Sequence, residues 1–117
     1  MLDNIEIFGL AQARARHAAA RQAVTATNVA NADTPGYRAQ DIAAFERVFT
    51  RGSGSAAEAA RAMQFTTFDA RGAASPNGNT VSLEAEMLRS VEAQRAHSRA
   101  LTVYQSALTV LRTSLGR

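Results

Sequence analysis

The side chains that could catalyse a reaction or bind a metal are few and do not group into a site. His17 and His97 are the only histidines, and neither belongs to a His-x-x-x-His or Glu-x-x-His pair. The sequence has no cysteine, which excludes disulfides and thiolate metal ligands. A metal site needs three or four such ligands. We therefore expect no metal and no other cofactor, and we expect both histidines to lie at interfaces or in solvent.

The acidic and hydroxyl side chains also lack a catalytic pattern. Glu84, Glu86 and Glu92 cluster near the start of a predicted helix, where the helix dipole explains them better than acid–base catalysis. No Gly-x-Ser-x-Gly sequence marks a nucleophile. The Gly-Ser-Gly-Ser run at residues 52–55 lacks the Gly-Lys-Ser/Thr of a phosphate-binding loop. We expect no enzyme activity, no catalytic residue and no small-molecule substrate.

Composition indicates one modest domain that forms helix more easily than it forms a core. The chain has 117 residues, and 46% of them are hydrophobic, but many of these are alanine. Aromatic residues make up 6%, and there is no Trp. Alanine favours helix yet buries little apolar surface. The composition thus suggests a chain that completes its packing against neighbours.

Charge and hydropathy exclude two classes of partner. All 13 basic residues are arginine, the net charge is +3, and the arginines are spread from Arg14 to Arg117 rather than gathered in a patch. Nucleic-acid binding favours a clustered patch, so we expect none. The first six residues are acidic rather than basic, and no apolar run is long enough to span a bilayer. Taken alone, this predicts neither a secretory signal nor a membrane helix, and a cytoplasmic location.

Residues 28–41 are the most distinctive stretch, and they mark the end of a helix. Asn31 can adopt the left-handed conformation that closes a helix, and Pro35 prevents its continuation. Thr34-Pro-Gly-Tyr predicts a type II turn, with Gly36 at the position that requires a positive φ. We expect Asn28 and Asn31 to hydrogen-bond backbone groups at the helix end. Tyr37 and Arg38 are expected to project from the turn and dock on a neighbour.

Two long helices are predicted, over residues 4–31 and 82–115. Ser82 is the predicted N-cap of the second helix, and Gly116 is predicted to end it. The first helix carries a row of small residues, Ala11, Ala15, Ala18 and Ala26, that suits close contact with another helix. Larger apolar residues at three–four spacing predict the packing positions. These are Ile7, Leu10 and Val24 in the first helix, and Leu83, Met87, Leu101, Tyr104, Leu108, Leu111 and Leu115 in the second. Gln94 and His97 interrupt the second stripe, and we expect them to face another subunit.

The segment between the helices, residues 42–80, has mixed character. Ile42, Phe45, Val48 and Phe49 predict a short amphipathic turn, residues 51–55 a flexible break, and residues 56–63 a short helix. In residues 64–69 polar and apolar side chains alternate, which predicts a brief extended segment. Residues 72–79 have the composition of a loop.

These elements predict an all-α fold. It is an antiparallel two-helix coiled-coil hairpin of the N- and C-terminal helices, with an irregular middle segment that includes a short extended piece. We divide the chain into residues 1–41, 42–80 and 81–117. The helices have too few large side chains to cover each other, so subunit packing should complete the fold. Two functions fit: a structural subunit, or a free-standing hairpin adaptor that binds one partner through its heptad stripe.

Residues 28–41 resemble the signature near the N-terminus of bacterial flagellar axial proteins, which are rod, hook and hook-junction subunits. The shared pattern is Asn-apolar-Ala-Asn followed by Thr-Pro-Gly-Tyr and a basic residue. The opening Met1-Leu-Asp with Ile5 and Phe8, and residues 78–87, are similar to the proximal-rod subunit of this family. Val29 and Arg38 stand where isoleucine and lysine are common, and Ser82 where Asp is common.

The resemblance implies a structural subunit of the flagellar proximal rod, which packs its helices into the drive shaft that transmits torque. It implies homo- and hetero-oligomeric assembly with other rod subunits and with basal-body ring or adaptor proteins. It further implies passage through the flagellar export apparatus without a cleaved signal peptide, and a place in the basal body within the periplasmic space.

Overall fold

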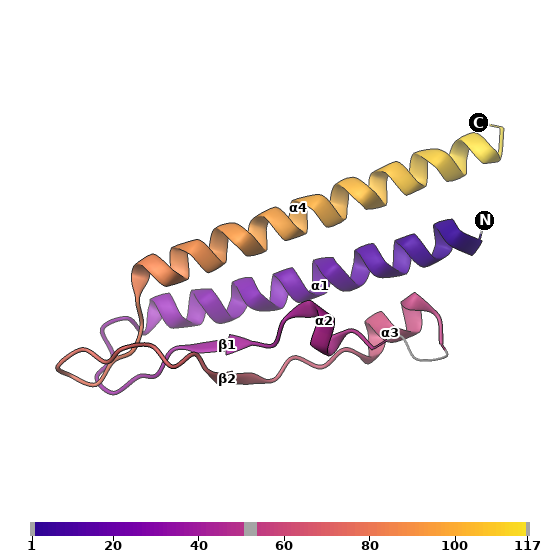
Figure 1. Cartoon of the computed structure of the whole chain (residues 1–117). Coiled ribbons are helices and arrows are strands. Elements are labelled where there is room, and N and C mark those ends of the chain that lie inside the picture. The colour runs from indigo at the N-terminus through magenta and orange to yellow at the C-terminus, as the bar shows by residue number, and fades with distance from the viewer. Residues whose placement is uncertain (1, 51–53, 117) are drawn as a thin grey trace.

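Two long antiparallel helices form the frame of the molecule, and the middle segment runs along one side of it (Figure 1). The structure is a computed structural model that describes residues 2–50 and 54–116, with side chains from residue 5 onward. The molecule is elongated, with extents of 63 × 28 × 15 Å. In chain order the elements are α1 (Leu2–Ala30), β1 (Gln40–Ile42), α2 (Phe45–Val48), α3 (Ala56–Ala62), β2 (Thr67–Asp69) and α4 (Leu83–Ser114). The predicted helical hairpin is confirmed.

The ends of α4 follow from local sequence chemistry. The Ser82 hydroxyl accepts a hydrogen bond from the Ala85 N–H, so it satisfies one of the free donors of the first turn. Leu115 follows the last helical residue, and Gly116 then takes a φ of +78°, which glycine adopts without steric cost. Both predicted helix ends are confirmed.

The two long helices meet along a row of small side chains, which we call the alanine seam. It consists of Ala11, Ala18 and Thr25 of α1 with Ala93, Ala100 and Ala107 of α4, all of them buried. Small side chains let two helix backbones approach closely, but each contact removes little apolar surface from water. The seam therefore brings the helices together without supplying much hydrophobic stabilisation.

The predicted heptad stripe lies beside the seam rather than in it. Leu83, Met87, Leu101, Tyr104 and Leu115 are exposed, from 44% at Tyr104 to 68% at Met87, whereas Leu108 and Leu111 are half-buried. On α1, Ile7 and Leu10 are exposed and Val24 is half-buried. On α4 each seam residue directly precedes a stripe residue in the sequence: Ala93 precedes Gln94, Ala100 precedes Leu101, and Ala107 precedes Leu108. Tyr104 nevertheless packs its ring against Phe8 of α1, with centroids 4.9 Å apart. The packing role predicted for the larger residues stays a prediction, and the exposed ones leave room for contacts outside this chain.

The middle segment covers the other side of α1. Ala13, Phe45, Ala60 and Met63 form a buried cluster, against which Val48, Phe49 and Phe65 pack. At Gly9 the α3 backbone comes so close that a Cβ atom would lie 2.5 Å from the Ala57 nitrogen. The helix accepts a glycine there because only glycine leaves room for this approach.

The middle segment is more regular than the sequence predicts. The short helix and the extended piece appear as α3 and β2, and residues 72–79 form a loop as expected. However, β2 pairs antiparallel with β1, in a register that places Asp41 opposite Phe68. No strand was predicted at β1. Of the predicted flexible break, residues 51–53 lie outside the described residues.

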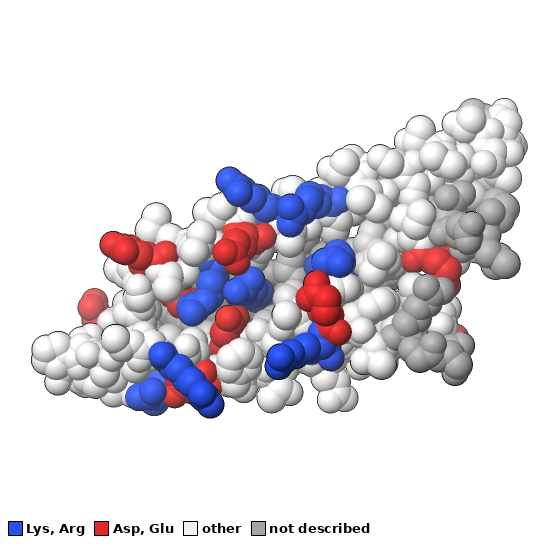
Figure 2. Space-filling model, in the orientation of Figure 1, with Lys and Arg blue, Asp and Glu red and all other residues white. Residues whose placement is uncertain are grey.

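Much apolar surface remains uncovered along the two long helices. Beyond the stripe residues, Leu88, Val91, Val103 and Val110 of α4 are exposed. In Figure 2 charged side chains lie over the left and central parts of the face, and the C-terminal end of α4 shows none there. Within the described residues, no helix is long and apolar enough to cross a membrane.

Candidate functional site

The turn after α1 has the predicted type II geometry. Gly36 has a φ of +73°, and the Tyr37 N–H donates to the Thr34 carbonyl at 3.2 Å. The backbone of Asn31 differs from the prediction, whereas its predicted hydrogen bond to a backbone group is present. Among the non-glycine residues that the structure describes, Arg71 alone has a positive φ. The Asn31 side chain instead donates to the Thr27 carbonyl at 2.8 Å and accepts from the Thr34 hydroxyl at 3.1 Å. A side-chain amide, rather than a left-handed residue, thus closes this helix.

Asn28 joins three elements through one fully buried amide. Its Nδ2 donates to the Gln40 carbonyl of β1 at 2.7 Å and to Glu86 Oε1 of α4 at 2.8 Å. Its Oδ1 accepts from the Gln40 N–H at 3.0 Å and from the Tyr37 hydroxyl at 3.3 Å. The hydrogen-bonding capacity of the amide is therefore met within the chain, as burial requires.

Glu86 begins a chain of alternating charges between the two long helices. Its carboxylate is completely buried and forms an ion pair with Arg89 one turn later. Arg89 Nε lies 3.6 Å from Asp41, and Arg21 Nε lies 3.4 Å from the other oxygen of the same carboxylate. Arg21 also reaches Glu92 at 3.3 Å. Each charge thus has an opposite charge beside it, which offsets the cost of removing it from water.

The loop before α4 binds the turn after α1. The buried Asn79 side chain donates to the carbonyls of Asn31 at 2.9 Å and Thr34 at 2.7 Å. Thr80 donates its N–H to the Tyr37 carbonyl at 2.9 Å and accepts from the Ala39 N–H at 2.8 Å. We call Asn28, Asp41, Asn79, Thr80, Glu86 and Arg89 the polar clasp. It joins residues 28–41 and 78–87, two stretches that the sequence analysis singled out separately.

Tyr37 and Arg38 both contact their own chain. The Tyr37 hydroxyl donates to Asn28, and the Arg38 guanidinium forms an ion pair with Asp69 at the end of β2. Neither side chain simply projects from the turn as expected. The docking role predicted for them stays a prediction.

The Arg38–Asp69 pair has a measurable pH dependence. The hydrogen bond from Arg38, with a second from the Arg71 N–H, holds the pKa of the Asp69 carboxyl below its ordinary value of 3.8. The pair therefore stabilises the fold above that value, and this contribution is lost as the pH falls through the lowered pKa. In an NMR titration, Arg38→Gln should move the Asp69 pKa back upward, whereas Arg95→Gln should leave it unchanged. An Asp69 titration that is identical in the Arg38 variant would contradict the assignment.

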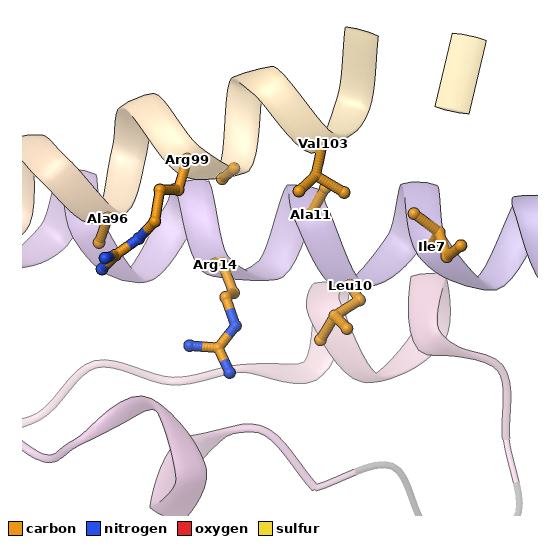
Figure 3. A pocket seen from close by; sticks show the side chains of 8 residues that line it. Ile7, Leu10, Ala11, Arg14, Ala96, Arg99 and Val103 are labelled. Carbon is orange, nitrogen blue, oxygen red and sulfur yellow. The ribbon is translucent and has the colours of Figure 1, made fainter. Parts of the chain in front are cut away.

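A groove with an apolar lining runs along one flank of the alanine seam (Figure 3). Its volume is about 310 Å³. Ile7 and Leu10 lie toward one end, and Arg14 and Arg99 lie toward the other. Ala11, Ala96, Ala100 and Val103 complete it, and we call the whole set the flanking groove. A second groove follows the opposite flank, lined by Ala11, Gln12, Ala15, Ala100, Leu101 and Tyr104. Both grooves exist because the seam is narrow and the larger side chains stand beside it.

The two histidines do not come together in a metal site. The His17 ring packs near Phe45 and Phe65, and its Nε2 lies 2.7 Å from the Ala43 carbonyl, at the contact between α1 and the middle segment. His97 is half-buried on α4. Among residues 2–50 and 54–116, no three His, Cys, Asp or Glu side chains gather as a metal site requires.

Comparison with known proteins gives this geometry a family context. Residues 9–38, which include most of α1, both asparagines and the turn, match the family model described as "Flagella basal body rod protein". The match covers about a quarter of the chain, so residues 9–38 are similar to this part of flagellar basal body rod proteins. It is also similar to the flagellar basal body rod protein FlgB of Agrobacterium fabrum, at 48% identity over 44 residues. That alignment covers 38% of this chain and 33% of the relative, so the match spans about a third of the relative's length.

Residues 9–38, which match the family model, contain one of the six polar clasp residues. Asn28 lies within residues 9–38, whereas Asp41, Asn79, Glu86 and Arg89 lie outside them. Sequence analysis assigned Glu86 only to the helix dipole and gave no partner to Asp41 or Arg89. One signal was available: Glu86 precedes Ala93, Ala100 and Ala107 at the same spacing of seven.

Proposed function

We propose that the chain is a structural subunit of the bacterial flagellar basal-body rod, which assembles by packing α1 and α4 against neighbouring subunits. The match of residues 9–38 to the rod-protein family model supports this proposal. In this proposal the chain has no catalytic residue, cofactor or small-molecule substrate. Its work is mechanical: it contributes stiff helices to a drive shaft that transmits torque.

One observation carries the proposal beyond family resemblance: the long helices leave large apolar side chains uncovered on both flanks of their seam. Ile7 and Leu10 of α1 and Leu101, Val103 and Tyr104 of α4 are all more than a third exposed, and they border the two grooves. Contiguous apolar surface of this kind usually marks a protein–protein contact. Helices of neighbouring subunits would fill the grooves and remove these side chains from water.

The finer points of the proposal follow from the family. The partners would be other rod subunits, copies of this chain, and ring or adaptor proteins of the basal body. Gln94 and His97 would face a neighbouring subunit. The chain would leave the cell through the flagellar export apparatus without a cleaved signal peptide and occupy the periplasmic part of the basal body. No observation favours a free-standing hairpin adaptor.

A charge placed in the flanking groove tests the proposal. In the source bacterium lacking this gene, a copy with Ile7→Asp should accumulate normally but restore little or no swimming. Ile7 lies at the end of the groove away from Arg14 and Arg99, and a buried unpaired carboxylate there opposes subunit packing. Electron microscopy of purified basal bodies should show rods missing or incomplete. Ser106→Asp adds the same charge at an exposed polar position of α4 and should support swimming.

Equal swimming with the two aspartate variants would count against this groove as an assembly surface. Normal swimming and intact basal bodies without the gene would count against a rod function altogether.

A further inference from the structure

The alanine seam repeats itself and so does not specify how far α4 extends along α1. Ala11, Ala18 and Thr25 follow one another at intervals of seven on α1, as do Ala93, Ala100 and Ala107 on α4. Sliding one helix past the other by seven residues, about 10.5 Å, would again place small side chains opposite small side chains. Apolar burial therefore distinguishes poorly between the observed register and the slipped ones.

The polar clasp breaks this repetition at one end of the seam. Glu86 occupies the next position of the α4 repeat, seven residues before Ala93, and bonds the buried Asn28 at 2.8 Å. A slide by seven in one direction would bring Ala93 to the level of Asn28 and leave the amide without this partner. Asn28 cannot follow the slide, since its amide is held by both backbone groups of Gln40.

Asn79 fixes the same register from the loop that precedes α4. Its side chain holds the carbonyls of Asn31 and Thr34, so the start of α4 stays close to the end of α1. Between β2 and α4 the chain has no helix or strand, so its backbone could otherwise follow a displaced helix. The buried side chains of Asn28, near the end of α1, and Asn79, before the start of α4, thus both hold the place where these two helices meet.

We propose that Asn28, Asn79 and Glu86 are positioning residues that select one axial register of α1 against α4 from several that the alanine seam allows. A buried polar group that is paired in one register and unpaired in the others penalises the others. This inference concerns the fold of the single chain, so it does not depend on the rod function.

Cysteine cross-linking measures the register directly, because the natural chain has no cysteine. Phe8 and Tyr104 have ring centroids 4.9 Å apart, so Phe8→Cys with Tyr104→Cys reports the observed register. Phe8→Cys with His97→Cys, and Phe8→Cys with Leu111→Cys, report slips by one heptad in either direction. Dibromobimane, a short thiol cross-linker, joins each pair in the otherwise intact full chain. We expect the first pair to react at least about tenfold faster than the slipped pairs.

The clasp variant should lose this preference. The same cysteine pairs are placed in the double variant Asn28→Ala/Asn79→Ala. There we expect the cross-linking rate of at least one slipped pair to come within about threefold of the rate for Phe8→Cys with Tyr104→Cys, because the registers then differ little in polar pairing. Met63→Ala is the matched control. It weakens the contact between α1 and the middle segment without touching the clasp, and it should keep the full preference.

Three results would overturn the proposal. The first is equal reaction of all three pairs in the otherwise intact chain, and the second is an undiminished preference in the clasp variant. The third is loss of helix, seen by circular dichroism, in the double variant and in both single variants Asn28→Ala and Asn79→Ala, while Met63→Ala keeps its helix. That result would make the clasp a requirement for folding itself rather than a selector of register.

If only the double variant loses its helix, the cross-linking rates of the three cysteine pairs are compared in the single variants instead.

Discussion

Glu86→Ala is expected to lower the free energy of unfolding by about 3–5 kcal/mol, the range typical for removing one partner of a buried ion pair. The Glu86 carboxylate is completely buried and accepts from both Asn28 and Arg89. Its removal leaves the Asn28 amide short of one acceptor and leaves Arg89 with Asp41 as its remaining partner. Urea denaturation followed by circular dichroism measures the loss.

Two neighbouring variants make the Glu86 result specific. Glu84→Ala removes an exposed carboxylate from the same first turn of α4, and should cost at most about 0.3–1 kcal/mol through the helix dipole. Glu86→Gln keeps an oxygen acceptor for Asn28 but removes the charge opposite Arg89, so its effect should lie between the other two. Equal effects of Glu84→Ala and Glu86→Ala would show that the buried contact contributes little.

Phe45→Ala is expected to release the middle segment from α1, with a cost of about 3–5 kcal/mol, as is typical for a buried phenylalanine. Phe45 is 7% exposed, stacks on Phe49 with centroids 5.0 Å apart, and lies under the Arg14 guanidinium at 4.3 Å. It belongs to the cluster that holds α3 against α1. Amide hydrogen exchange should show the loss first in α3, while the central turns of α4 change less.

Phe68→Ala is the control for this experiment. Phe68 lies on β2 and is 50% exposed, so truncating it removes little buried surface and should leave α3 protection nearly unchanged. If the two variants exposed α3 to the same degree, the cluster around Phe45 would not be what attaches the middle segment.

The larger shape of this chain could be predicted from its sequence because the signals are local. A run without proline predicts α1, the Pro35-Gly36 pair predicts the turn that follows, and Ser82 and Gly116 mark the ends of α4. Each of these effects depends on a few neighbouring residues, so no knowledge of the rest of the fold is needed.

The seam could be predicted only in part. The row of small residues on α1 indicated Ala11 and Ala18, which are buried, but nothing indicated the α4 side. Periodicity and side-chain size favoured the stripe through Leu101 and Leu108, but the helices meet through Ala93, Ala100 and Ala107 instead. Helix α1 has two neighbours, with α4 on one side and the middle segment on the other, and alanines allow the closer approach. Which face a helix buries depends on all its neighbours, and periodicity within one helix does not reveal them.

By itself, then, the sequence determined the two long helices and the turn between α1 and the middle segment, because short-range backbone chemistry controls each of them. The likeness to flagellar rod proteins could also be read from it, because short runs of residues such as 28–41 carry that likeness. Only the tertiary structure decided that Asn28 meets Glu86, 58 residues away, that Asp41 lies between Arg21 and Arg89, and that Asn79 holds the turn after α1. The path of the whole chain brings the members of each of these contacts together, because they lie far from one another in the sequence.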